Sequence, residues 1–287
     1  MIRFQEAYMN SLKIYAFADE ASSRIDNQIA AMQRNQLNGL EIRNVDGQSI
    51  SDISEDKAHE VRHKLDDVGL AVWSLGSPIG KIGIDNEDFP GHLDKLRHSL
   101  VLADILGAQN IRMFSFYVPE NDPEGYRNKV RDRIGMMLEA ADGSGITLCH
   151  ENEKGIYGSN ASRCLELLDT FPEMAGIFDP ANFIQCGQET WEAWNLLKHR
   201  VKYLHIKDAL ANGSVVPAGN GIGHLKQILD EYRSMNGNAV TIEPHLTVFD
   251  GLKELEQTGN KTKPDAFCYA SSDIAFDAAC DALKALL

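Results

Sequence analysis

Short apolar runs alternate with longer amphipathic stretches along almost the whole chain. The apolar runs predict eight β-strands, at residues 12–17, 39–42, 70–75, 110–116, 146–150, 175–178, 201–206 and 239–242. The stretches after them place apolar residues at helical spacing and predict helices at 22–35, 54–68, 88–106, 124–141, 159–168, 189–197, 222–233 and 271–287. A strand followed by a helix, repeated in this way, favours βα units and a parallel sheet.

Eight such units predict an α/β fold of the (β/α)₈ TIM barrel type, with residues 1–287 forming a single domain. An open doubly wound sheet is the alternative. It is disfavoured because no Gly-x-Gly-x-x-Gly follows any predicted strand. The first strand-to-helix turn, at 18–22, also contains no glycine that would admit a pyrophosphate.

The composition of the chain disfavours some classes of binding partner. The chain carries 28 Lys and Arg against 42 Asp and Glu, a formal charge of −14, so its surface repels phosphate backbones and no nucleic-acid partner is expected. The five cysteines include no Cys-x-x-Cys pair, which disfavours a disulfide framework or thiolate zinc site and favours a reducing compartment. Because no run of about 18 apolar residues is present, we expect a cytoplasmic protein with no membrane partner.

The carboxyl ends of barrel strands are where TIM-barrel active sites are built. Each of the last four predicted strands ends in a carboxylate or an imidazole, and these residues are Glu151, Asp179, His205 and Glu243. Three carboxylates with one imidazole suit Mn²⁺, Co²⁺ or Mg²⁺, and Zn²⁺ also fits. The sequence therefore predicts one divalent metal ion at this end of the barrel.

Side-chain alternation along the strands is compatible with all four residues pointing inward. It does not separate Glu151 from Glu153, or Glu243 from His245, because the members of each pair share a face. Any one of the four, taken alone, is as well explained as a solvated loop residue or a helix cap, and Asp179 has such a role open to it in the turn 179–182.

Other polar residues near the strand ends are candidates for substrate binding, namely Glu41, Lys81, Arg112, Asn182, Lys207 and His245. Lys81 lies between Gly80 and Gly83, where its charge could meet a substrate carboxylate or phosphate, although a flexible surface lysine is the simpler reading. For Glu41 and Arg112 the alternative is a buried ion pair inside the barrel.

The strand-end sequences Glu-Asn at 151–152, Asp-Pro-Ala-Asn-Phe at 179–183, His-Ile-Lys-Asp at 205–208 and Glu-Pro-His at 243–245 resemble the xylose isomerase-like TIM barrel superfamily of sugar phosphate isomerases and epimerases. The segments 39–43 and 111–115 also look like its second and fourth strands.

This resemblance implies that one metal ion is bound by the four strand-end residues just named, and that Glu151 and Glu243 form the proton-transfer pair, as in the ketose epimerases of the superfamily. The chain departs from those epimerases at two places. Many of them have a histidine where this chain has Asn182, and they tend to have an arginine shortly after the histidine of the seventh strand, where this chain has Lys207 and Asp208.

We therefore expect a divalent-metal-dependent isomerase or epimerase of a small sugar, polyol or keto acid, which abstracts a proton next to a carbonyl through a metal-bound enediolate. An inosose-dehydratase-like lyase and a non-catalytic sugar-binding barrel are the alternatives. An endonuclease IV-type repair enzyme is disfavoured, because the first four strand ends offer no histidine and the charge is −14. The expected partner is a small-molecule carbohydrate or keto acid, and homo-oligomer formation is left open.

Overall fold

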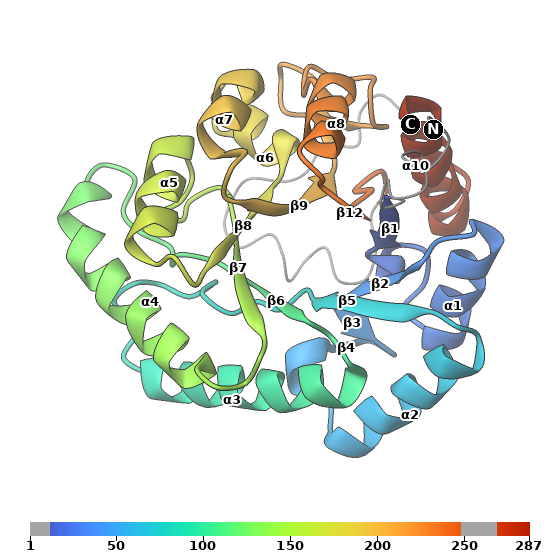
Figure 1. Cartoon of the computed structure of the whole chain (residues 1–287), viewed down its shortest axis with the longest axis horizontal. Coiled ribbons are helices and arrows are strands. Elements are labelled where there is room, and N and C mark those ends of the chain that lie inside the picture. Colours follow the sequence, from blue (N-terminus) through green and yellow to red (C-terminus); the bar gives the residue numbers. More distant parts are fainter. Residues whose placement is uncertain (1–11, 248–268) are drawn as a thin grey trace, which may run out of the picture.

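Eight parallel strands close into a barrel in the computed structural model of the chain, which describes residues 12–247 and 269–287 (Figure 1). Around the barrel they are β1 (Lys13–Ala16), β2 (Gly39–Ile42), β5 (Ala71–Leu75), β6 (Asn110–Met113), β7 (Thr147–Glu151), β8 (Ala175–Phe178), β9 (Val201–Ile206) and β12 (Ala239–Ile242). The last strand pairs with the first, with Lys13 opposite Ala239. The predicted (β/α)₈ barrel is therefore confirmed, and the open sheet is excluded.

The helices form a ring around the barrel (Figure 1). They are α1 (Ile25–Arg34), α2 (Glu55–Asp67), α3 (Phe89–Leu106), α4 (Arg127–Ala141), α5 (Ala161–Thr170), α7 (Thr190–Leu197), α8 (Leu225–Ser234) and α10 (Ser272–Leu286). Side chains of Ser54, Asn160 and Ser271 cap α2, α5 and α10 by accepting backbone N–H bonds. Among the described residues, no helix has the length and apolar content needed to span a membrane.

Several short elements were not predicted from the sequence. They are the 3₁₀ helices η1 (Ala18–Glu20) and η2 (Ile50–Asp52), the helix α6 (Pro180–Gln185), and the hairpins β3 (Asn44–Val45) with β4 (Gln48–Ser49) and β10 (Asp208–Ala209) with β11 (Val215–Val216). Each is too short to show the periodic spacing of apolar residues from which a helix or strand is predicted. Residues 248–268, between the last predicted strand and the last predicted helix, lie outside the described residues.

The fourth predicted strand was expected to reach residue 116 and ends at Met113. Beyond it the backbone N–H groups of Phe114 and Phe116 bond to the carbonyls of Ile79 and Gly80, in the loop after β5. Phe116 has a φ of +65°, which takes the chain out of extended conformation. The apolar run therefore continues as a buried loop.

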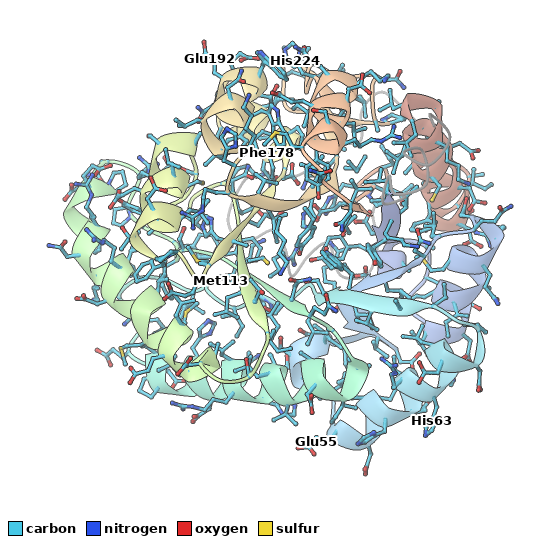
Figure 2. All side chains as sticks on the ribbon, viewed as in Figure 1. Glu55, His63, Met113, Phe178, Glu192 and His224 are labelled. Atoms are coloured by element: carbon cyan, nitrogen blue, oxygen red, sulfur yellow. The ribbon has the colours of Figure 1, made fainter. Side chains whose placement is uncertain are left out.

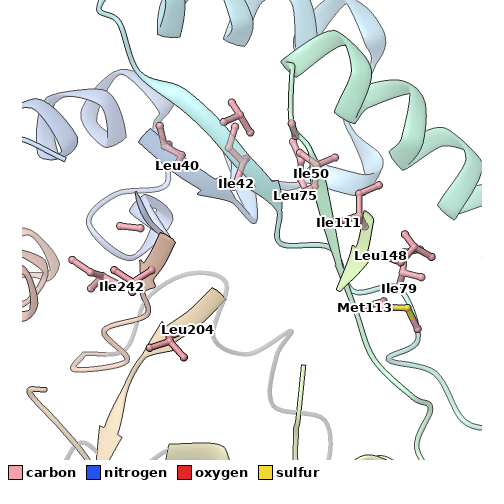
Figure 3. Close-up of a cluster of buried hydrophobic side chains, with 14 of the residues drawn as sticks. Leu40, Ile42, Ile50, Leu75, Ile79, Ile111, Met113, Leu148, Leu204 and Ile242 are labelled. Carbon is pink, nitrogen blue, oxygen red and sulfur yellow. The ribbon is translucent and has the colours of Figure 1, made fainter. Parts of the chain in front are cut away.

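Apolar side chains on the outer faces of the strands form the main core, between the barrel and the helices. Figure 3 shows Leu40 and Ile42 from β2, Ile111 from β6 and Leu204 from β9 in this layer. In Figure 2 the labelled residues Glu55, His63, Glu192 and His224 lie at the rim of the molecule, whereas Met113 and Phe178 lie inside.

The inside of the barrel is layered. At the amino ends of the strands an apolar plug is formed by Tyr15, Trp73, Cys149, Ala175, Ile177, Tyr203 and Ala239. Two residues further along β7, β8 and β9 come Glu151, Asp179 and His205, because side chains on a strand alternate between its faces. Polar groups therefore occupy the layer above the plug, at the carboxyl ends of the strands.

Candidate metal centre and active site

Four buried side chains meet at the carboxyl end of the barrel. Glu151, Asp179, His205 and Glu243 each present one oxygen or nitrogen atom, and these atoms all lie within 4.8 Å of one another. They come from the ends of β7, β8, β9 and β12, so barrel closure brings together residues up to 92 positions apart in the sequence, since 243 − 151 = 92. The structure thus unites the four residues that the sequence predicted as metal ligands.

The two carboxylate oxygens of Asp179 have different roles: one caps a helix and the other faces the four-residue group. Its Oδ1 accepts the backbone N–H of Asn182 at 2.8 Å and caps α6. Its Oδ2 is buried and accepts no hydrogen bond from the described residues, although the Lys207 ammonium is 2.8 Å away. Asn152 fixes the backbone of Asp179 from both sides, donating to its carbonyl and accepting its N–H. Helix cap and ligand candidate are therefore both correct descriptions, one for each oxygen.

His205 is held between two carboxylates. Its Nδ1 lies 3.0 Å from Oε1 of Glu151, and its Nε2 lies 3.1 Å from Oε2 of Glu41. The Tyr203 hydroxyl donates to the other oxygen of Glu41 at 2.9 Å. Glu41 thus faces His205 from behind, and does not form the isolated ion pair with Arg112 that was considered from the sequence.

Glu151 is held on its far side by Arg112. Nη1 of Arg112 donates to Oε2 of Glu151 at 3.2 Å, while Nη2 donates to the carbonyl of Gly76 at 3.1 Å. Asn182 donates its side-chain amide to Oε1 of Glu151 at 3.3 Å. Arg112 and Asn182, both predicted to bind substrate, are therefore in contact with a candidate ligand.

Glu243 is held by a cluster of residues that were not among the predicted site residues. Nη1 of Arg43 lies 3.4 Å from Oε1 of Glu243, and the same guanidinium donates to Asp19 at 2.9 and 3.1 Å and to Glu20 at 3.1 Å. The Phe17 ring lies 4.6 Å from the Arg43 guanidinium carbon. Arg43 follows Glu41 by two residues, so strand alternation places both on one face, and that signal was available in the sequence.

The remaining predicted residues lie toward the rim. Lys207 pairs with Asp179 and with Oε2 of Glu243 at 2.9 Å. Lys81 pairs with Glu153 at 2.9 Å, and Glu153 is not part of the four-residue group, whereas Glu151 is. His245 has a left-handed backbone with a φ of +45°, and its N–H donates to Glu20 at 2.6 Å. Its Nδ1 is 3.6 Å from Oε1 of Glu243.

The electrostatics of the centre are dominated by crowded carboxylates. Burial, together with repulsion from Glu243 and Glu151, outweighs the attraction of Lys207 and raises the pKa of Asp179 to about 7. Burial acts the same way on Glu243, but Lys207 and His245 hold its pKa well below the usual range. Burial disfavours a charged His205, yet Glu151 and Glu41 raise its pKa well above the usual value. The centre therefore strongly favours added positive charge.

These residues fit a divalent metal ion. Each of the four has one atom turned to the common centre, while its second polar atom is tied elsewhere: Asp179 to the start of α6, Glu243 to Arg43, Glu151 to Arg112 and His205 to Glu41. A carboxylate behind a coordinating histidine is the usual arrangement around protein-bound metals. Oxygen-rich sites with one imidazole suit Mn²⁺, Co²⁺, Mg²⁺ and Zn²⁺, so the identity of the ion stays open.

Comparison with known proteins agrees with this architecture. The model of the family described as xylose isomerase-like TIM barrel matches residues 29–257. The chain therefore belongs to the xylose isomerase-like TIM barrel family, as the strand-end motifs predicted.

Individual relatives are distant. The uncharacterised protein YihM of Escherichia coli (strain K12) is 22% identical over 257 residues, which is 85% of this chain and 73% of that protein. Among solved structures, the probable 3-DHS dehydratase AsbF from Bacillus anthracis has a TM-score of 0.72 at 16% identity, covering 94% of this chain and 98% of its own. The D-allulose 3-epimerase from Methylomonas sp. has a TM-score of 0.72 at 16% identity, covering 97% and 99%. At these identities the solved structures establish a shared fold.

Proposed function

We propose that this protein is a divalent-metal-dependent isomerase or epimerase of a small sugar, polyol or keto acid. The observation that carries the proposal is the convergence of Glu151, Asp179, His205 and Glu243 within 4.8 Å, each with its second polar atom engaged by a separate partner. The structural likeness to a ketose epimerase supports the reaction class.

A bound divalent ion would supply positive charge that stabilises the enediolate formed when a proton leaves the carbon next to a carbonyl. Glu151 and Glu243 are the proposed proton-transfer pair. Lys207 and His245 hold the pKa of Glu243 well below the usual range, so Glu243 is present at neutral pH as the carboxylate that proton transfer requires. Arg112 and Arg43 fix the far oxygens of the two glutamates and orient their near oxygens.

Substrate contact is proposed for the predicted residues that keep some exposure, which are Lys207, His245 and Lys81, with side chains 5%, 9% and 9% exposed. Glu41, Arg112 and Asn182 were also predicted to bind substrate. Their contacts support a different proposal for them, in which they hold the metal ligands His205 and Glu151 in place.

Two measurements on the purified protein test the proposal. Elemental analysis after growth in metal-supplemented medium should find close to one divalent ion per chain, and Glu151→Gln should lower that content. Incubation with a panel of ketoses in D₂O should place deuterium on the carbon next to the carbonyl. A metal content below about a tenth of an equivalent, unchanged in Glu151→Gln, would overturn the site.

The same experiment separates the alternative reactions. The enediolate can also expel a β-hydroxyl group as water, and the structural likeness to a dehydratase makes this lyase outcome the second candidate. It would appear as a product lighter by one water molecule. Saturable binding of a sugar without any exchange would instead favour the non-catalytic sugar-binding barrel.

A further inference from the structure

The Lys207 ammonium lies on the same oxygens that the metal ion needs. Its Nζ is 2.8 Å from Oδ2 of Asp179 and 2.9 Å from Oε2 of Glu243. Oδ1 of Asp179 is used by the α6 cap, and Oε1 of Glu243 faces Arg43, so the two oxygens that Lys207 contacts are the ones left for coordination. An ammonium on these two oxygens and a divalent ion bound to the same oxygens would repel each other at short range, so binding of the ion opposes the contacts of Lys207.

Among the described residues, three Lys and Arg side chains contact the candidate ligands, and they differ in how they are anchored. Arg43 is fixed by two hydrogen bonds to Asp19, and Arg112 is fixed by the carbonyl of Gly76. Both guanidinium groups approach the ligands from behind and can stay in place. Both ion pairs of Lys207, in contrast, are made with ligand carboxylates, and its flexible four-carbon stem allows the ammonium to move.

A further carboxylate near the site, that of Glu153, attracts the Lys207 ammonium. Glu153 lies at the rim of the same site with a side chain 16% exposed, and attraction to Lys81 and Lys207 outweighs burial to lower its pKa to about 2. An ammonium released from Asp179 and Glu243 would remain attracted to the Glu153 carboxylate.

We propose that Lys207 is a built-in competitor of the metal ion: its ammonium bridges Asp179 and Glu243 in the metal-free protein, leaves them when the metal binds, and then faces the substrate. This rests on the proposed function, because it assumes that the four-residue centre takes a metal. In this exchange the Lys207 ammonium faces the substrate only when the metal ion is bound. The metal affinity is also lower than the four ligands would give without Lys207.

Titration of the EDTA-treated protein with MnCl₂, followed by calorimetry, tests this competition. Lys207→Met should bind Mn²⁺ at least about tenfold more tightly than the wild type, because a full charge next to two ligand oxygens is removed. Lys207→Gln should do the same, since its amide is neutral, and it serves if the methionine variant does not fold. Lys207→Arg keeps the charge and should not tighten binding.

Lys81→Met is the matched control. It removes the same charge from the rim of the same site, but its partner is Glu153, outside the four-residue group, so its Mn²⁺ affinity should rise far less than that of Lys207→Met. A gain in the control equal to that of Lys207→Met would show a general charge effect and overturn the competition.

The outcomes separate the two proposals. If the wild type binds Mn²⁺ and the neutral Lys207 variants bind it equally or more weakly, the competition is wrong and the metal site stands. If Lys207→Met binds Mn²⁺ where the wild type does not, the competition is supported. If neither binds Mn²⁺, Zn²⁺, Co²⁺ or Mg²⁺, the metal-dependent function is wrong and the competition falls with it.

Discussion

Glu41 on β2 and His205 on β9 meet inside the barrel, with Oε2 of the carboxylate 3.1 Å from Nε2 of the imidazole. Their strands are not neighbours, since β12 and β1 lie between them in the barrel order. Glu41 contacts Nε2 of the imidazole ring, and Glu151 contacts Nδ1, the other ring nitrogen. Glu41 therefore sets which nitrogen of His205 is presented to the candidate metal centre.

Glu41→Gln should weaken metal binding by roughly 10- to 100-fold, the usual cost of losing a carboxylate behind a coordinating histidine. Calorimetric titration with Mn²⁺ measures this directly. Tyr203→Phe is the control, because it removes another contact to Glu41 and leaves the contact between Glu41 and His205 in place. Equal Mn²⁺ affinity in Glu41→Gln and the wild type would show that Glu41 has no part in orienting the ligand.

Glu243→Gln and His205→Ala should separate chemistry from coordination. The glutamine still offers an oxygen but cannot take a proton at neutral pH, so turnover should fall by roughly 10²- to 10⁴-fold with a modest loss of metal. Loss of the imidazole opens a coordination position, so His205→Ala should lose metal first and recover part of its activity with excess Mn²⁺. The comparison uses whichever substrate exchanges deuterium in the screen. Near wild-type turnover in Glu243→Gln would leave Glu243 as a ligand alone.

Asp208 should matter for stability and not for metal binding. Its buried carboxylate accepts backbone N–H bonds from Ala209, Gly219, Gly221 and Gly223 at 2.9–3.0 Å, which holds the loop between β9 and α8. Asp208→Ala leaves these donors without an acceptor and should lower the free energy of unfolding by about 3 kcal/mol or more.

Denaturation in urea measures the Asp208→Ala effect, with the exposed Asp230, paired to Lys226 on α8, as the control. Asp230→Ala should change stability little, because exposed ion pairs contribute little. A similar small change in both variants would mean that water replaces the lost acceptor.

His92 should make the protein less stable in weak acid. Its Nε2 accepts the N–H of Gly80 at 2.8 Å, and burial, helped by Lys95 and Arg133, lowers its pKa to about 4 from an ordinary 6.5. Below pH 6.5 the unfolded chain takes up a proton at this site that the folded chain does not. The stabilisation is therefore complete above pH 6.5 and is lost as the pH falls toward 4, by about 3 kcal/mol in all.

Urea denaturation of the wild type and His92→Gln across this range isolates the contribution, because the glutamine oxygen can accept the Gly80 N–H but does not titrate. The difference in unfolding free energy between the two proteins should shrink steadily as the pH falls from 6.5 to 4. A constant difference would show that His92 is protonated in the folded protein, contrary to its burial.

The sequence alone determined the architecture and predicted the candidate metal ligands. The alternation of short apolar runs with amphipathic stretches is a local property, repeated often enough to predict the barrel, and barrel topology places every strand end at one face. A carboxylate or imidazole at four successive ends, at 151, 179, 205 and 243, could therefore be assigned before any contact was known.

Only the tertiary structure decided between residues that share a strand face. Alternation tells which face a side chain lies on, but not how far from the centre it ends. Only the packed structure shows that Glu151 joins the four-residue group, whereas Glu153 lies outside it and pairs with Lys81. The partners behind the ligands come from strands distant in sequence, as Glu41 and Arg43 do, and their contacts exist only once the barrel closes. The position of Lys207 on two ligand oxygens is likewise a matter of side-chain reach, which depends on the packed geometry of three strand ends at once.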